Sequence, residues 1–583
     1  MKRFLIMLVI CGMTVALGWA AFQTAVPPQP ALSTYVPAGA LLYLEAKDFS
    51  GLLSDWNSSP QKRAWVESDN YEVFSRSRLF LRLKGAGDQF AAAAGLPPNM
   101  DFVAHLAGTR SALALYDIGN LQFLYITRLP SAKSMDTNLW QTRSKFEPRN
   151  AGGVAFYVRR DPDSQKEVAF AIAGDYLLLA TREDLLASAL QLMSGGNDHT
   201  IETEQWWSQS VSTAGSTGDL RLVLNLEKLV PSPYFRTYWV QQNITDMKQY
   251  SAAVSDLFRS GKEYREERVL IQKKPDTSQS APPPSARDIH ELLPLVPGGG
   301  DTVASDLVRL VPGSAGFYQA RAYPSPDACF QLLETKLLAP HLGPAPPSKL
   351  APSVQLSSGE IGAGSDLETR IDQSPAPTVA PRTISALKQL LDKTPALASL
   401  EVDLTDRDKI GVFVRLHTAI VLVAASEWDQ AAVQSALLDF VQPGMTASQL
   451  SVAWTTKTGY QQLDGLWSLA VATHGKDLVV SDDPALMEVI LANFNRKVDA
   501  KPAVFVAGFN HLRERENFHR FFGLVDGPHN SEPAYPGIAR PPKFFSGNMA
   551  SLSATLSAVS NEHVIVRNDG NKVQQTVTYE WVQ

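Results

Sequence analysis

Two serines stand three residues before a lysine, in Ser59-Pro60-Gln61-Lys62 and Ser385-Ala386-Leu387-Lys388. In some acyl-transfer enzymes this spacing brings a lysine beside a nucleophilic serine across one helical turn. Serine and lysine are common residues, however, so such matches also arise by chance. A helix cap followed by a solvated lysine is therefore the preferred interpretation of both sites.

The densest polar cluster of the chain runs from His511 to His519 and contains two histidines and two glutamates. The histidines are eight residues apart, slightly more than two helical turns, and the glutamates fall at other angles around a helix. Arg513 and Arg515 beside the glutamates predict a self-paired, solvated face. Because the corresponding stretch 227–234 has no histidine, a duplicated metal site is excluded.

Cysteine and the paired aromatic residues are the other candidates for chemistry. Cys329 precedes Leu332-Leu333 and is expected to pack as a small hydrophobic residue. Trp206-Trp207, Tyr238-Trp239 and Phe521-Phe522 could line a sugar or lipid groove, but the last two pairs occupy similar positions in the two halves. Positions that recur in this way are more simply explained as core.

Several other local signatures of catalysis are absent. The chain has no Gly-x-Ser-x-Gly, no His-Glu-x-x-His, no phosphate-binding Gly-x-x-x-x-Gly-Lys-Ser/Thr, no Cys-x-x-Cys and no EF-hand spacing. Its 53 basic and 59 acidic residues give a net charge of -6 without a basic stripe, which argues against nucleic acid as a partner. We therefore expect no catalytic residues, no metal and no cofactor.

Strand pairs and helices alternate along each half of the chain. The apolar runs 112–118 and 121–126 flank Gly119-Asn120, which predicts a hairpin with a positive φ at Gly119. Residues 562–567 and 572–582 flank Asn568-Asp569-Gly570-Asn571, the strongest hairpin signal of the sequence.

Helix signals lie between these strands. Ser59-Pro60 predicts a helix start, and Gly95 with Pro97-Pro98 predicts the end of the run 90–94. Strand pairs separated by helices predict an α+β fold with antiparallel sheets, each covered on one face by helices.

The two halves also resemble each other. Residues 36–43, Val-Pro-Ala-Gly-Ala-Leu-Leu-Tyr, recur as 311–318, Val-Pro-Gly-Ser-Ala-Gly-Phe-Tyr, and residues 169–179 are similar to 470–480. A third pair joins residues 226–229 to 509–512. Because the blocks keep their order, we interpret the chain as a diverged tandem duplication.

Composition sets the boundaries of these parts. We assign the first repeat to 36–272, a Pro/Ser/Gly-rich linker to 273–310 and the second repeat to 311–583. A second stretch rich in Pro, Ser and Gly, 339–381, is predicted to be a mobile loop insertion.

The N-terminus carries an export signal. Lys2 and Arg3 precede an apolar run that ends near Gly18-Trp19-Ala20, a sequence that suits a signal peptidase. The segment 1–21 is therefore a signal peptide, or a membrane anchor if it stays uncleaved. Residues 22–35 form a Pro-rich spacer. Both outcomes place the body outside the cytoplasm, in the periplasm or secreted, and membrane contact is expected only through this segment.

The opening Val36-Pro37-Ala38-Gly39-Ala40-Leu41-Leu42-Tyr43-Leu44-Glu45, soon after the export segment, and the block near Gly174 resemble an exported bacterial family of unknown function. The resemblance implies a location in the cell envelope and transfers no catalytic residues.

These observations predict an exported, non-enzymatic envelope protein of two related α+β halves, which binds an unidentified envelope protein or ligand. Two alternatives remain open. An envelope hydrolase would need a Ser or Cys within hydrogen-bond reach of a His in a cleft. A carrier of lipids or other hydrophobic molecules would need a large apolar cavity.

Overall fold

The computed structural model describes residues 30–67, 71, 74–96, 102–162, 165–196, 199–232, 247–273, 303–338, 381–407, 414–445, 452–498, 501–517 and 558–582. These residues form two compact units. The first comprises Met1–Ser54 and Arg82–Trp239, and the second comprises Asp55–Leu81 and Val240–Gln583. Both contain helices and antiparallel sheet, which confirms the α+β prediction.

The first unit is built on an antiparallel sheet with the strand order β4-β5-β6-β7-β3-β2-β1-β8. Its strands are β1 (Leu42–Ala46), β2 (Ser111–Asp117), β3 (Gln122–Arg128), β4 (Glu147–Ala151), β5 (Val154–Arg160), β6 (Glu167–Ala173), β7 (Tyr176–Ala180) and β8 (Leu220–Asn225).

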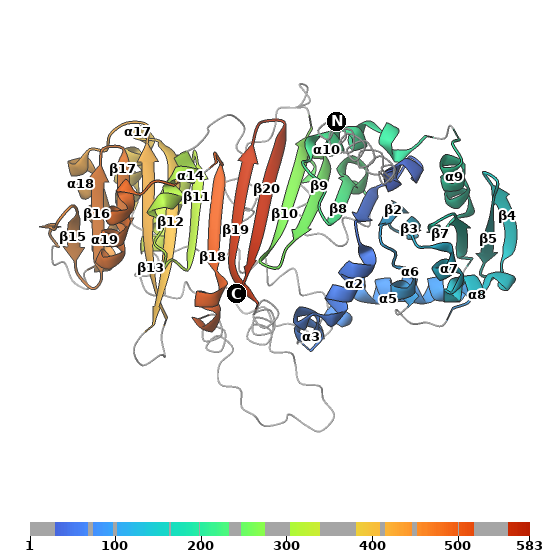
Figure 1. Cartoon of the computed structure of the whole chain (residues 1–583). Helices are drawn as coiled ribbons and strands as arrows, with labels where there is room; N and C mark the ends of the chain where they lie inside the picture. The colour runs from blue at the N-terminus through green and yellow to red at the C-terminus, as the bar shows by residue number, and fades with distance from the viewer. Residues whose placement is uncertain are drawn as a thin grey trace, which may run out of the picture. The chain divides into compact units, whose positions relative to one another are not determined.

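Helices lie in the connections between these strands (Figure 1), and one of them, α3, belongs to the second unit. They are η1 (Leu32–Tyr35), α2 (Phe49–Ser58), α3 (Pro60–Val66), α5 (Arg78–Ala94), α6 (Phe102–Leu106), α7 (Ser131–Met135), α8 (Asn138–Gln141), η2 (Arg143–Lys145), α9 (Glu183–Met193), η3 (Ile201–Thr203), α10 (Gln205–Thr213) and α11 (Leu226–Leu229). α5 ends where predicted, because Gly95 adopts a positive φ of 68° that an L residue rarely takes. Its alanines pack against Phe170 and Leu177 of the sheet.

The second unit has a longer antiparallel sheet with the strand order β9-β10-β20-β19-β18-β11-β12-β13-β17-β16-β15-β14. Its strands are β9 (Tyr250–Arg259), β10 (Glu263–Gln272), β11 (Phe317–Ala322), β12 (Ala396–Arg407), β13 (Val414–Ala424), β14 (Thr455–Thr456), β15 (Gln461–Asp464), β16 (Ser468–His474), β17 (Asp477–Ser481), β18 (Phe505–Asn510), β19 (Val559–Asn568) and β20 (Lys572–Trp581).

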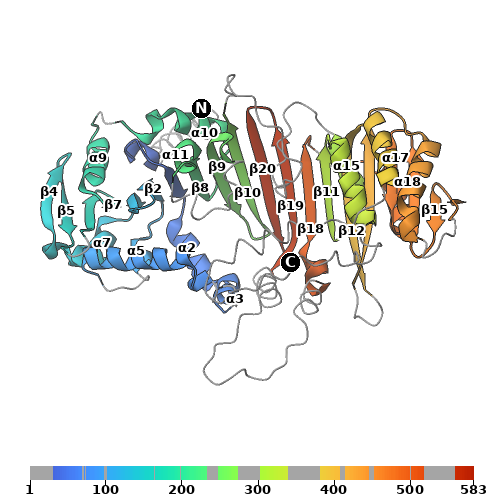
Figure 2. The same cartoon turned by 180° about the vertical axis from the view of Figure 1, so that it is seen from behind.

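Helices cover both faces of this second sheet, whereas the sequence predicted cover on one face only. Figures 1 and 2 show α14 and α19 over one face and α15, α17 and α18 over the other. The helical segments are α14 (Val303–Leu307), η4 (Val308–Leu310), α15 (Pro326–Leu333), the π-helix η5 (Glu334–Leu338), α17 (Pro381–Lys393), α18 (Gln430–Met445), α19 (Pro484–Ala492), η7 (Asn493–Asn495) and a helix over 511–517. β13, β16 and β17 are buried on both sides, and their sequences carry apolar residues at consecutive positions.

Two predicted hairpins form, one of them with a different turn. β2 and β3 pair as expected, but the positive φ falls on Leu121 and not on Gly119. The side chain of Asp117 accepts hydrogen bonds from the backbone N–H of Gly119 and Asn120, which closes the loop without a left-handed glycine. In the β19–β20 hairpin, Gly570 does adopt a positive φ, of 85°.

The strands of the two halves pair in the same order. Tyr43 lies on β1 between β2 and β8, and Tyr318 lies on β11 between β12 and β18. The ladders β2·β3, β3·β7, β6·β7, β5·β6 and β4·β5 recur as β12·β13, β13·β17, β16·β17, β15·β16 and β14·β15. This shared order supports the proposed duplication.

Helical residues lie within the ends of the two segments that the sequence assigned to a spacer and a linker. Leu32, at the end of the predicted spacer 22–35, is fully buried in η1. Likewise Ala304 and Leu307, at the end of the predicted linker 273–310, are buried in α14. Apolar residues near the end of a polar stretch thus belong to the following core.

The export segment 1–21 and residues 339–380 of the predicted insertion lie outside the described residues, so their predictions stand as predictions. Among the residues that the structure describes, no helix has the length and apolar character to cross a membrane.

Candidate functional site

Ser59 caps a helix and does not face its lysine as a nucleophile would. The Ser59 hydroxyl accepts a hydrogen bond from Lys62 N at 3.0 Å and donates to Trp56 O at 2.8 Å. Lys62 Nζ instead donates to Asn57 Oδ1 at 2.6 Å. A general base must lie within hydrogen-bond reach of the proton it removes, and the ammonium of Lys62 is engaged elsewhere.

The chain also contains Ser68-Asp69-Asn70 and Lys457-Thr458-Gly459, the two tripeptides that accompany Ser-x-x-Lys in acyl-transfer enzymes. The first lies outside the described residues. The second forms the turn between β14 and β15, where Lys457 N donates to Tyr460 O at 2.9 Å. Because the Ser59 hydroxyl caps a helix, these sequence matches do not form a catalytic site among the residues described.

The second Ser-x-x-Lys match lies on α17, and its lysine has a partner of its own. Lys388 Nζ donates to Asp327 Oδ1 at 2.7 Å. Asp327 belongs to α15, so this ion pair ties two neighbouring helices together. The contact is structural and exposed.

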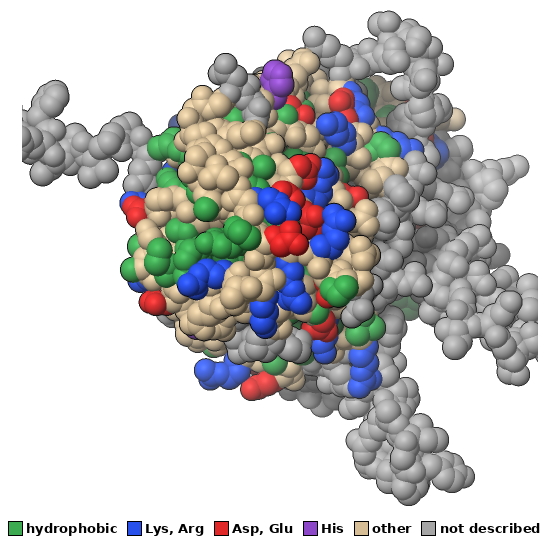
Figure 3. All heavy atoms as spheres, turned by 90° about the vertical axis from the view of Figure 1, so that its right-hand side faces the viewer, with side chains coloured by type: hydrophobic (Ala, Val, Ile, Leu, Met, Phe, Trp, Pro, Cys, Tyr) green, Lys and Arg blue, Asp and Glu red, His purple; other side chains and the backbone are tan. Residues whose placement is uncertain are grey.

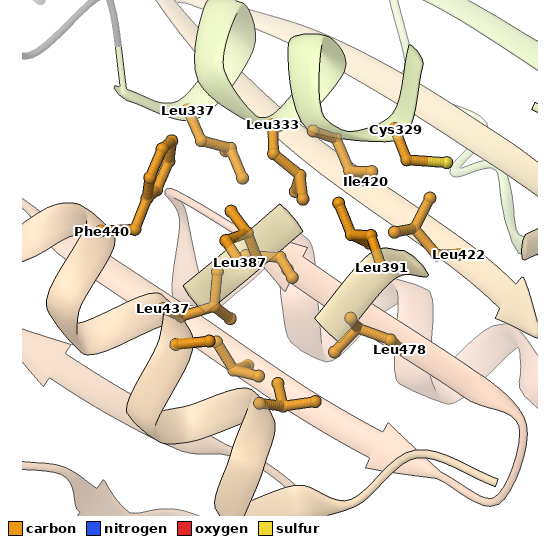
Figure 4. Packing of buried hydrophobic residues seen from close by; sticks show 14 of the residues in the cluster. Cys329, Leu333, Leu337, Leu387, Leu391, Ile420, Leu422, Leu437, Phe440 and Leu478 are labelled. Carbon is orange, nitrogen blue, oxygen red and sulfur yellow. The ribbon is translucent and has the colours of Figure 1, made fainter. Parts of the chain in front are cut away.

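Cys329 is buried in the helical layer over β12 and β13 (Figure 4). It packs with Leu391 and Leu422, and burial raises the pKa of its thiol to about 12. A thiol with so high a pKa is not a nucleophile at neutral pH. Trp206 and Trp207 are buried as well, the latter with its ring edge-on to Tyr43 at 4.9 Å.

The polar cluster around His511 is not the solvated face that its sequence suggested. Glu514 is only 3% exposed, and the hydroxyl of Thr405 on β12 donates to its carboxylate at 2.6 Å. His511 Nε2 lies 3.2 Å from Glu562 Oε2. The described residues contain no group of three side chains that could hold a metal ion, and His519 lies outside them.

Thr405 belongs to a line of polar side chains along one face of β12. Ser399, Glu401 and Asp403 alternate with Ala398, Leu400 and Val402, and every one of these residues is buried. Successive residues of a strand point to opposite faces, so the two acids lie on the same side of the sheet. Glu401 and Asp403 thus form a buried acidic pair, which we take as the candidate functional site.

One lysine serves both acids. Lys336 on η5 places its Nζ close to Glu401 Oε1, at 2.5 Å, and to Asp403 Oδ2, at 3.2 Å. Neighbouring strands contribute neutral partners: Gln319 Nε2 donates to Glu401 Oε2 at 2.5 Å, and Thr418 Oγ1 donates to Asp403 Oδ1 at 2.8 Å. Two carboxylates therefore share a single ammonium group in a buried setting.

This imbalance of charge perturbs the ionisation of the cluster. Burial, and then repulsion from Glu401, raises the pKa of Asp403 from 3.8 to about 6, although Lys336 and Thr418 oppose the change. Burial alone would lower the pKa of Lys336, but Glu401 and Asp403 together raise it. The site can therefore take up a proton on Asp403 just below neutral pH while Lys336 stays charged.

Sequence reasoning missed this pair for a clear physical reason. Alternating acidic and apolar residues usually mark a strand with one solvated face. Here η5 covers the acidic face, and π-helical turns of this kind are rare and occur often at functional sites. The corresponding positions in the first half are occupied by Leu113 and Leu115. These leucines flank Ala114, which pairs with Tyr43. In the same way, Glu401 and Asp403 flank Val402, which pairs with Tyr318. Only the second half carries the acids.

Charged side chains of both signs lie beside one another on one face of the protein. Figure 3 shows Lys and Arg beside Asp and Glu on one face of the molecule. On β4, Arg149 pairs with Glu147 at 2.7 Å, and Arg160 of β5 pairs with Glu167 of β6 at 3.0 Å.

No family model matches the chain, and no curated protein matches it. Solved structures similar to parts of it include crystal forms I and IV of TP0453. The first is 13% identical, covers 42% of this chain and 81% of TP0453, and has a TM-score of 0.23. The second is 12% identical, covers 42% and 83% of the two chains, and has a TM-score of 0.24. Scores this low assign neither a fold family nor a function to this chain.

Proposed function

We propose that the protein is exported to the cell envelope and has a non-enzymatic binding or structural role there. The observation that carries the proposal is that polar side chains with the spacing of catalytic groups are engaged in structural contacts. Ser59 caps a helix, Lys388 pairs with Asp327, His511 pairs with Glu562, and Cys329 is buried. The described hydrogen bonds of histidine side chains run to Glu562 and Tyr318, and neither joins a serine or Cys329.

Export is tested by fusing a reporter enzyme that works only outside the cytoplasm after Val36. The positive residues Lys2 and Arg3 followed by an apolar segment should direct the reporter across the membrane, giving activity in intact cells. Deleting residues 4–21 is the matched control and should abolish that activity. A reporter that is active only when retained in the cytoplasm would refute the proposed location.

A non-enzymatic role also predicts that the polar candidates can be replaced. Ser59→Ala, Lys388→Ala, His511→Ala and Cys329→Ala should each complement the phenotype caused by loss of the protein. The exposed change Lys388→Ala should cost within about 0.5 kcal/mol and the cap change Ser59→Ala about 1 kcal/mol, whereas Cys329→Ala removes a buried side chain and should cost more through lost packing, so stability is measured alongside. Leu178→Asp is the contrasting control, because it places a carboxylate at a fully buried position and should unfold the protein.

Two outcomes of this experiment would favour the hydrolase alternative. One is loss of complementation by a stably folded Ser59→Ala or His511→Ala protein. The other is covalent labelling of the wild-type protein, but not of Ser59→Ala, by a fluorescent penicillin, which acylates serines of the Ser-x-x-Lys class. We expect no such labelling.

A further inference from the structure

The last hairpin of each half has the same register. Adding 309 to both residue numbers converts the pairs of β9 and β10 into those of β19 and β20: Arg259 opposite Tyr264 becomes Asn568 opposite Val573. The correspondence holds along the whole hairpin. It also relates Tyr250 opposite Gln272 to Val559 opposite Trp581 at the far end.

The two hairpins share an irregularity as well. The register of both ladders shifts near that far end, where Ser251 in one hairpin and Ser560 in the other are bulge residues with no residue opposite them in the ladder. Each of these serines donates from its hydroxyl to the strand opposite, Ser251 to Ile271 O at 3.4 Å and Ser560 to Glu580 O at 3.2 Å. These residues are again 309 apart. A bulge that recurs with the same residue and hydrogen bond is a feature inherited by both copies.

The two hairpins are joined by their equivalent strands. β10 pairs antiparallel with β20 from Glu263 opposite Glu580 to Ile271 opposite Lys572. The centre of this ladder is Glu267 opposite Thr576, which are themselves equivalent positions, 309 apart. Equivalent strands that pair antiparallel over almost their full length are what a two-fold interface between identical subunits requires.

We infer that the β10·β20 ladder is a homotypic dimer interface, in which the last hairpin of one repeat binds the last hairpin of a second copy, here within one chain. Val269, Val573 and Val577 are buried along the joint. Arg268 Nη1 crosses it to donate to Gln575 Oε1 at 3.3 Å. The interface thus supplies its own backbone hydrogen bonds and apolar area, and covalent linkage of the repeats is not needed to maintain it.

The test uses the full chain with a protease site inserted between Ser280 and Ala281 and cut after folding. The two fragments should remain one complex in size-exclusion chromatography. Gln575→Pro removes a backbone N–H that β20 donates to β10 and should release them. The hydrogen-bonded pairs of this ladder alternate from Gln272 with Asn571 to Lys262 with Trp581 and include Arg268 with Gln575. Asn150→Pro, in β4, which pairs only with β5 among the described strands, is the matched control and should leave the complex intact.

A second measurement does not depend on the proline variant folding. In Glu267→Cys/Thr576→Cys, a short bismaleimide should link the cut fragments on a denaturing gel. In Glu267→Cys/Gln575→Cys the side chains lie on opposite faces, so no link should form. Cys11 and Cys329 are common to both proteins and cannot explain a difference. Fragments that separate without a substitution, stay together in a folded Gln575→Pro protein, or fail to crosslink at 267 and 576 would overturn the inference.

Discussion

Replacing Lys336 with methionine should lower the unfolding free energy of the second unit by about 3–5 kcal/mol at neutral pH. The substitution keeps the length of the side chain but removes the single ammonium group that Glu401 and Asp403 share. Glu401 is 1% exposed, so water cannot solvate its carboxylate unless the contact between η5 and β12 opens. Urea unfolding followed by far-UV circular dichroism measures the loss.

Two further variants separate this mechanism from a general effect of losing a lysine. Lys388→Met breaks the exposed pair with Asp327 and should cost at most about 1 kcal/mol. The triple variant Lys336→Met/Glu401→Leu/Asp403→Leu introduces the leucines found at the corresponding positions 113 and 115, and it should regain most of the lost stability. A Lys336→Met protein as stable as the wild type would show that the lysine does not compensate the acids.

The sequence predicted hairpins well because their signals are local. Asn568-Asp569-Gly570-Asn571 contains the turn residues and the positive φ that the β19–β20 hairpin uses. The turn at Gly119 was assigned to the wrong residue, because the Asp117 side chain stabilises the loop and Leu121 takes the left-handed conformation. The sequence alone does not show whether a side chain such as that of Asp117 will accept the hydrogen bonds of the turn and so change which residue takes the positive φ.

Burial of polar residues was predicted less well, since it depends on contacts between segments distant in the sequence. Glu514 lies among arginines and histidines that suggest solvent, yet its carboxylate meets Thr405, 109 residues away. An added Cβ at Gly316 would lie 2.1 Å from Glu514 Oε1, so this glycine leaves room for the carboxylate. Lys336 and Glu401 are likewise separated by the residues 339–380, whose composition gave no indication that the flanking segments meet.

Glu401 and Asp403 share only one ammonium group, that of Lys336, and this predicts how the stability of the second unit depends on pH. The pKa of Asp403 is about 6 in the folded protein, above its value of 3.8 in an unfolded chain. A carboxyl group with a raised folded-state pKa favours folding most below pH 4, and this contribution is lost as the pH rises through about 6. Over that interval the shift corresponds to about 3 kcal/mol, since one pKa unit is about 1.4 kcal/mol.

Asp403→Asn should therefore make the second unit more stable than the wild type at about pH 7.5, with the difference vanishing near pH 4. The amide cannot ionise, and Lys336 is then matched by Glu401 alone. Carboxylates elsewhere with lowered pKa values, such as Glu266 and Asp117, change stability in the opposite direction, so the measured quantity is the difference between the two proteins at each pH. Asp327→Asn, at an exposed ion pair, is the control and should change stability by at most about 1 kcal/mol. A difference for Asp403→Asn that stays constant from about pH 4 to pH 7.5 would contradict a raised pKa of Asp403 in the folded protein.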